Sequence, residues 1–89
     1  MARPHTKDSL LVQFGMRVRE LRKAARLSQE QLALQSELDR SYVGQVERGE
    51  RNISLKNIEK LARALHVAPY ELLQFPPCGF PRAASADQR

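Results

Sequence analysis

Residues 27–49, LSQEQLALQSELDRSYVGQVERG, decide the fold of this chain. Ser28 is a good helix N-cap, and a glutamine three residues later completes a Ser-x-x-Gln capping box. The apolar pattern breaks at residues 35–38, after which Asp39 can cap a second helix that ends at Gly49. The stretch therefore predicts two short helices joined by a tight turn.

Helical periodicity continues on both sides of this pair. Upstream, apolar residues recur every three or four positions through residues 11–25, on one face of a helix. Downstream, Ser54 caps an amphipathic helix over residues 55–65, and Pro69 fits the first turn of a last helix that ends near Phe75. No segment has the alternating pattern of a β-strand. The sequence thus predicts an all-α fold of five short helices around one core.

The length and charge of the chain limit its class. Its 89 residues allow one small domain, and 15 Lys and Arg against 10 Asp and Glu give a net charge of +5. Such a basic excess favours nucleic acid or an anionic membrane surface as partner. A membrane partner is disfavoured because the basic residues are spread over several helices. The longest aliphatic run, residues 10–12, is far shorter than the roughly 20 residues of a membrane span.

Composition also divides the chain and indicates its compartment. We expect an N-terminal arm at residues 1–8, a helical domain at residues 9–75 and a Pro-rich, disordered tail at residues 76–89. The single cysteine, Cys78, cannot form an internal disulfide, and no Cys/His cluster suggests a metal. We therefore expect a cytoplasmic protein without disulfide, metal or cofactor.

Two short helices in a basic helical domain suggest a helix-turn-helix, and residues 27–49 resemble that of the Cro/phage-repressor (XRE-like) family. Residues 14–33, FGMRVRELRKAARLSQEQLA, are similar to the first two helices of this family, and residues 54–73, SLKNIEKLARALHVAPYELL, to the last two. Residues 38–54, LDRSYVGQVERGERNIS, are similar to controller proteins of restriction–modification systems. The resemblance implies a five-helix lambda-repressor-like DNA-binding domain over residues 11–75.

The outward face of the second motif helix carries side chains suited to bases. Arg40, Ser41 and Gln45 lie there, opposite the valines that anchor the helix to the core. Arginine pairs with guanine O6 and N7, glutamine with adenine N6 and N7, and serine with either base. We also place Gly44 on this face, where it lets the backbone approach the groove. The three polar residues are therefore the predicted base contacts.

Other residues suit the DNA backbone. Ser28 and Gln29 lie at a helix N-terminus, where free N–H groups and the helix dipole favour a phosphate. Arg51 and Asn52, in the loop after the motif, are further phosphate candidates. Tyr42 either stacks on sugar-phosphate or covers the edge of the core. The resemblance implies DNA contacts at Gln29, Arg40, Ser41, Tyr42, Gln45, Arg51 and Asn52.

Two expectations concern how the domain is held together. Arg22 and Glu47 match family positions that form a partly buried ion pair between the first and third helices; the alternative is two solvated charges. One small core cannot bury all the apolar groups, so we expect a homodimer. The family dimerises through its C-terminal helices, which makes Tyr70, Leu73 and Phe75 the interface candidates. The alternative is that these three residues close the core of the monomer.

The chain departs from the family at two helix ends. Glu37 stands in the turn where relatives often have Gly or Asn, and Arg26 stands where many have a Gly that ends the first helix. A positive φ at a residue other than glycine costs about 1 kcal/mol or more. We therefore expect a local rearrangement at the turn.

Three classes of function follow. The first is a dimeric, sequence-specific transcription regulator that binds a pseudo-palindromic operator in double-stranded DNA, and we favour it. The second is an antitoxin-like protein-interaction module with secondary DNA binding, which co-purification of a partner chain would reveal. The third, an enzyme, lacks any paired acid and base, nucleophile, phosphate-binding Gly loop or metal set, so we predict no catalytic residues. We expect no small-molecule effector, because no residues remain to form an effector domain.

Overall fold

The computed structural model describes residues 9–75, and the expectations for an arm at residues 1–8 and a tail at residues 76–89 lie outside this range. Over the described range the fold is all-α, as predicted, with no strand. The last predicted helix is a 3-10 helix rather than an α-helix. The elements are α1 (Ser9–Ala24), α2 (Gln29–Ser36), α3 (Arg40–Glu47), α4 (Leu55–Leu65) and η1 (Pro69–Leu73).

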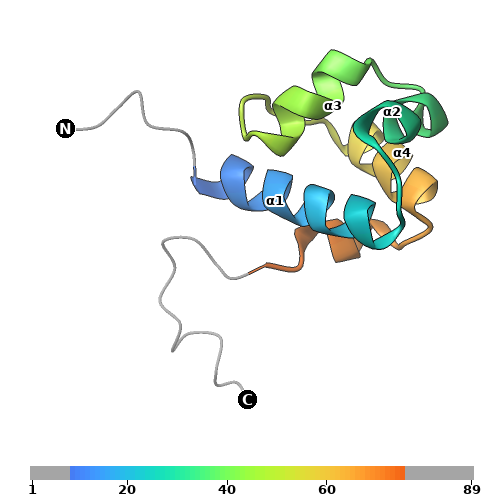
Figure 1. Ribbon diagram of the computed structural model, residues 1–89. Coiled ribbons are helices and arrows are strands. Elements are labelled where there is room, and N and C mark those ends of the chain that lie inside the picture. Colours follow the sequence, from blue (N-terminus) through green and yellow to red (C-terminus); the bar gives the residue numbers. More distant parts are fainter. Residues whose placement is uncertain (1–8, 76–89) are drawn as a thin grey trace.

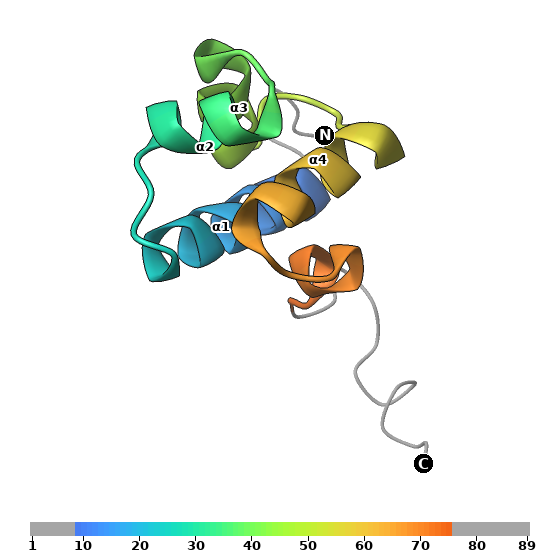
Figure 2. The same ribbon diagram turned by 90° about the vertical axis from the view of Figure 1, so that its right-hand side faces the viewer.

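The elements are arranged around α1. Helices α2 and α3 lie on one side of α1 and η1 lies on the other, while α4 packs on both α2 and η1 (Figures 1 and 2). None of the described helices is long and apolar enough to span a membrane. The core between the elements contains the valines and leucines expected from the periodicity, among them Val18, Leu32, Val43, Val46, Leu61 and Leu72.

The two serine caps form as the sequence predicts. Ser28 Oγ accepts a hydrogen bond from Gln31 N at 3.0 Å, and Gln31 Oε1 accepts one from Ser28 N at 2.8 Å, which completes the capping box. Ser54 Oγ accepts from Asn57 N at 3.2 Å. Asp39 occupies the N-cap position of α3, but its side chain makes no capping hydrogen bond. The position of the helix start was therefore predicted correctly, but the expected capping hydrogen bond of Asp39 does not form.

Three helices end in a left-handed residue that is not glycine. Arg26, Glu37 and His66 have φ of 63°, 61° and 61° after α1, α2 and α4. Each donates its N–H to the carbonyl three residues back, and the next residue donates to the carbonyl five residues back, which is the Schellman pattern. The local rearrangement expected at the turn is therefore wrong, because Glu37 itself adopts the left-handed conformation. His66 is a third such residue, which the sequence did not predict.

The apolar faces predicted for α1 and α4 each include one terminal residue that is exposed in the structure. Leu55 is 81% exposed, because α4 begins at an end that projects past the neighbouring elements (Figure 2). Ala25 follows the end of α1 and is exposed. The interior positions of both helices are buried as expected, so the errors concern single residues at the helix ends.

Arg17 holds α1 to η1. Its Nε donates to the backbone carbonyl of Glu71 at 2.8 Å, and its Nη2 lies 3.5 Å from Gln74 Oε1. Its Nη1 also pairs with Glu20 at 3.0 Å. Arg17 therefore connects two elements of the fold.

Helices α1 and α3 approach most closely at Gly15. A Cβ atom at this position would overlap the backbone carbonyl oxygens of Val46 and Glu47. The buried Gly15 therefore sets how closely the C-terminal end of α3 lies on α1.

Candidate nucleic-acid interface

Helices α2 and α3 pack against each other and are joined by the turn at residues 37–39. Ala33 is only 3% exposed at the centre of α2, as expected for a close approach. Gly44 is also buried: a Cβ there would lie 3.6 Å from Gln29 Oε1 of α2 and 3.3 Å from Arg48 Nη1. The placement of Gly44 on the outward face was wrong, because α2 covers this side of α3.

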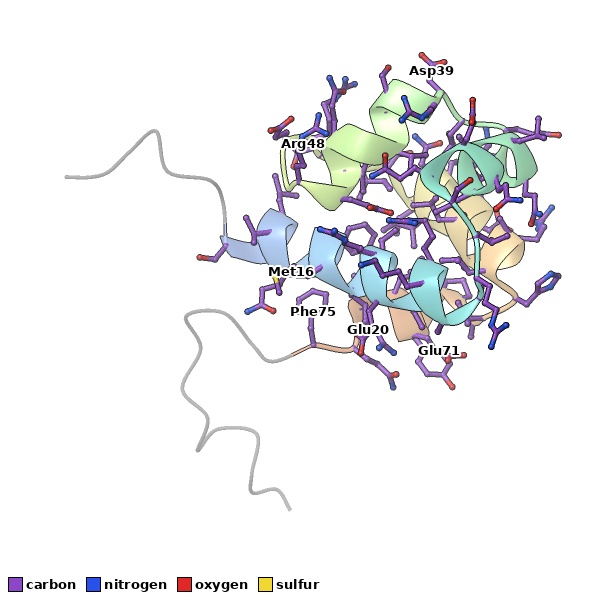
Figure 3. The ribbon with its side chains drawn as sticks, in the orientation of Figure 1. Met16, Glu20, Asp39, Arg48, Glu71 and Phe75 are labelled. Atoms are coloured by element: carbon purple, nitrogen blue, oxygen red, sulfur yellow. The ribbon has the colours of Figure 1, made fainter. Side chains whose placement is uncertain are left out.

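The N-terminal end of α3 presents two of the predicted base contacts. Arg40 and Ser41 are exposed, and no residue between 9 and 75 forms a hydrogen bond or ion pair with either side chain. Figure 3 shows Asp39 and Arg48 at the two ends of α3, on the outer edge of the molecule. This end of α3 therefore offers polar groups that are available to a ligand.

Gln45 is instead held by the loop that follows α3. Arg51 Nη1 donates to Gln45 Oε1 at 3.0 Å, and the guanidinium carbon lies 5.1 Å from the centre of the Tyr42 ring. The hydroxyl of Tyr42 accepts from Asn57 Nδ2 of α4 at 3.0 Å. The structure thus brings three predicted DNA-contacting residues into one chain of contacts. These contacts among Tyr42, Gln45 and Arg51 were not predicted from the sequence.

Tyr42 packs against the core and is half-buried. Tyr42 thus covers the edge of the core, which is one of its two alternatives, and its contact with DNA stays a prediction. The Arg51 guanidinium lies over the Tyr42 ring, and this contact is favourable because the face of an aromatic ring attracts a cation.

The phosphate candidates Ser28, Gln29 and Asn52 differ in their exposure and in the hydrogen bonds that they already form. The Ser28 hydroxyl accepts the capping hydrogen bond and remains exposed. Gln29 is half-buried, and its Nε2 donates to Glu47 Oε1 at 3.0 Å. Asn52 is exposed in the loop after α3. Gln29 therefore reaches the surface with its amide already oriented by α3.

The carboxylate that orients Gln29 belongs to a buried ion pair. Arg22 Nε lies 2.6 Å from Glu47 Oε2, and Arg22 Nη2 lies 3.1 Å from Glu47 Oε1, so the pair is bidentate. The side chains are 11% and 3% exposed. Arg22 Nη1 also donates to the carbonyl of Leu27 at 2.9 Å. The ion pair expected between α1 and α3 is present, and through Gln29 it extends to α2.

The three interface candidates do not form one patch. Tyr70 and Leu73 are 65% and 50% exposed and line an apolar groove together with Leu55 and Ile58 of α4. Phe75 is half-buried and lines another groove, beside Met16 of α1 (Figure 3). The alternative that all three close the core of the monomer is wrong for Tyr70 and Leu73, whose side chains remain accessible.

Comparison with known proteins gives consistent matches. A model of the helix-turn-helix family matches residues 18–72. Control protein C.BamHI of Bacillus amyloliquefaciens is 44% identical over 73 residues, which cover 81% of this chain and 90% of that protein. The crystal structure of the restriction–modification controller protein C.AhdI from Aeromonas hydrophila is 68% identical, with a TM-score of 0.69, over 70% of this chain and 94% of that one. The hypothetical transcription factor NHTF from Neisseria is 44% identical, with a TM-score of 0.72, over 85% and 90%.

Proposed function

Because the chain belongs to the helix-turn-helix family of DNA-binding transcription regulators, as its sequence predicted, we propose that it binds a pseudo-palindromic operator as a homodimer. Several of its relatives carry restriction–modification control in their names, so the genes of such a system are the proposed targets. Under this proposal the protein acts in the cytoplasm, where the DNA lies. It needs no cofactor or small-molecule effector, and operator occupancy follows its concentration.

The observation that carries the proposal is the exposed N-terminal end of α3. Arg40 and Ser41 project there without partners among the described residues. In helix-turn-helix proteins the second helix of the motif lies in the major groove, with its N-terminal residues on the base edges. Arg40 and Ser41, with Gln45 one turn further, are therefore the proposed base contacts.

The residues around α3 are suited to the phosphates on either side of that groove. Gln29 lies at the N-terminus of α2, beside Ser28, where backbone N–H groups and the helix dipole favour an anion. Arg51 and Asn52 lie in the loop at the other end of α3 and are exposed. Tyr42, beneath Arg51, completes the set of proposed backbone contacts. These contacts would set the register of α3 without distinguishing sequences.

The groove lined by Tyr70 and Leu73 is the proposed dimer surface. When a second copy covers its exposed leucines and tyrosine, the dimer is stabilised by about 25 cal/mol per Å² of apolar surface buried. Phe75 lines a different groove, beside Met16, and is not part of the proposed surface. A two-fold dimer places its two α3 helices on half-sites about 34 Å apart, roughly one turn of DNA.

Selection of bound DNA from a random pool tests this proposal. We expect a single enriched motif with two inverted half-sites, their centres about 10 base pairs apart. The double variant with Arg40→Ala and Ser41→Ala should enrich no such motif while it keeps its thermal stability. If the wild-type protein enriches no sequence over the starting pool, the proposed function is wrong.

A further inference from the structure

The contact between Arg51 and Gln45 fixes the orientation of the Gln45 amide. Arginine has five N–H donors and no acceptor, so only the carbonyl oxygen of the amide can face it. Arg51 Nη1 lies 3.0 Å from Gln45 Oε1, which satisfies this requirement. The Nε2 amine therefore keeps both of its N–H donors for another partner, whereas Arg51 occupies one of the two lone pairs of Oε1.

Arg51 is itself held in place. Its guanidinium carbon lies 5.1 Å from the centre of the Tyr42 ring, and Asn57 of α4 donates to the Tyr42 hydroxyl at 3.0 Å. The loop is also fixed through its backbone, because Glu50 N donates to the carbonyl of Gln45 at 2.9 Å. The position of the Gln45 amide thus depends on contacts that reach back to α4.

The orientation of the amide decides which base it suits. A glutamine that contacts adenine uses both ends of its amide, because the oxygen accepts from N6 and the amine donates to N7. With Oε1 on Arg51, Gln45 offers the two N–H donors of Nε2. Guanine presents two adjacent acceptors, N7 and O6, whereas the N6 amine of adenine would oppose a second donor.

We propose that Gln45, oriented by Arg51, contacts guanine in preference to adenine. This inference rests on the proposed function and replaces the adenine pairing expected from the sequence. Arg51 acts as a positioning residue for base specificity, in addition to any contact it makes with a phosphate. A residue that only contacts phosphate weakens binding to all sequences alike, whereas a positioning residue changes the ratio between bases.

The first experiment identifies the base pair and its preference. Selection from a random pool is carried out with the wild-type protein and with Gln45→Ala, and the base pair whose preference disappears in the variant is the one that Gln45 contacts. We expect guanine at this pair in the wild-type selection. Adenine at this pair would overturn the inference, since Oε1 would then have to serve both Arg51 and the base. An unchanged motif for Gln45→Ala would also overturn it.

The second experiment isolates the role of Arg51. Dissociation constants are measured for two operators that differ only by guanine or adenine at that pair. The wild-type protein should favour guanine by about tenfold. Arg51→Ala should bring this ratio towards one, because the amide is then free to turn. Asn52→Ala, in the same loop, is the matched control: it should weaken binding to both operators equally and keep the ratio.

A charge substitution tests the same geometry in the opposite direction. Gln45→Glu keeps an acceptor for Arg51 but has no donor for guanine, so its selected motif should change to cytosine, whose N4 amine is a donor. A guanine-to-adenine ratio that Arg51→Ala leaves unchanged would overturn the inference while leaving the proposed function intact. Absence of any enriched motif with the wild-type protein would instead remove the proposed function, and this inference with it.

Discussion

At the scale of single residues, Gly15 shows how little space separates α1 from α3. A methyl group there would overlap the backbone carbonyl oxygens of Val46 and Glu47, which cannot rotate away as a side chain can. We expect Gly15→Ala to lower the free energy of unfolding by about 1–3 kcal/mol, measured by urea denaturation. This loss should occur even though alanine is the better helix former.

Gly44→Ala is the matched control for this prediction. The atoms nearest to its added methyl group are the ends of two flexible side chains, Arg48 at 3.3 Å and Gln29 at 3.6 Å. The substitution should therefore leave the stability unchanged or raise it by up to about 1 kcal/mol through helix propensity. Equal losses at the two glycines would show that the crossing at Gly15 is not tight.

Arg40 provides a test of base contact by one residue. Because it projects from the start of α3 without a partner among the described residues, it should contact particular base pairs. Arg40→Ala should lose about 1–3 kcal/mol of binding free energy on the selected operator and little on random DNA. Fluorescence anisotropy with both DNAs at one salt concentration measures the difference. An equal loss on both would identify Arg40 as a phosphate contact.

The residue-scale predictions from sequence succeeded where only helix position matters. Arg40 and Ser41 follow the N-cap of α3 and are exposed as expected. Gly44 was misplaced because it shares a helix face with the buried Glu47, three residues later, and this face is covered by α2. The contact of Arg51 with Gln45 depends on the path of a loop, which residue spacing does not specify.

At the scale of secondary-structure elements, the ion pair of Arg22 and Glu47 joins three helices. Glu47→Gln removes the charge but keeps the shape, and it leaves the buried guanidinium of Arg22 without a counter-charge. We expect a loss of about 1–3 kcal/mol in the free energy of unfolding. The matched control is Glu59→Gln, which breaks the exposed pair with Arg63 on α4 and should cost well under about 1 kcal/mol.

Urea titrations of both variants at low salt check this prediction. Denaturation midpoints for Glu47→Gln and Glu59→Gln that coincide would mean that burial adds nothing to the pair. The Glu47 variant should also weaken DNA binding, because Gln29 then loses the carboxylate that orients its amide.

Helix boundaries were predicted well because capping is local. Ser28 and Ser54 needed only the few residues after them. The last element was predicted as one of five α-helices, but it is a 3-10 helix in which Glu71 N donates to the carbonyl of Ala68 at 2.9 Å. Short helices often have the hydrogen bonds between residues i and i+3 that define a 3-10 helix. No sequence pattern distinguishes a short 3-10 helix from a short α-helix in advance.

At the scale of the whole molecule, the groove beside η1 leads to a prediction of assembly. Leu73→Glu places a carboxylate in the proposed dimer surface, where its burial would cost free energy. We expect the wild-type protein to be dimeric at tens of micromolar and the variant to be monomeric, measured by sedimentation equilibrium. Leu34→Glu, at a leucine of α2 that is 80% exposed, is the control and should remain dimeric. A monomeric wild-type protein under these conditions would contradict the proposed dimer.

Helical periodicity predicted the fold class, because the spacing of apolar residues within each helix indicates which face is buried. It did not predict how the elements dock. Only the position of η1 beside α1 gives Arg17 the carbonyl of Glu71 as a partner. Contacts between elements 54 residues apart are a property of the assembled molecule.

The left-handed helix ends at Arg26, Glu37 and His66 bear on how long each copy of this protein persists in a cell. A residue other than glycine in this conformation lowers the free energy of unfolding by roughly 1 kcal/mol. Each such loss raises the unfolded fraction about fivefold. Where proteases degrade that fraction, these three backbone angles would shorten the lifetime of the molecule. If operator occupancy follows the protein's concentration, as proposed above, lifetime sets how soon a target gene responds once synthesis stops. The tempo of regulation would then be encoded in helix ends that lie outside the DNA-contacting helix.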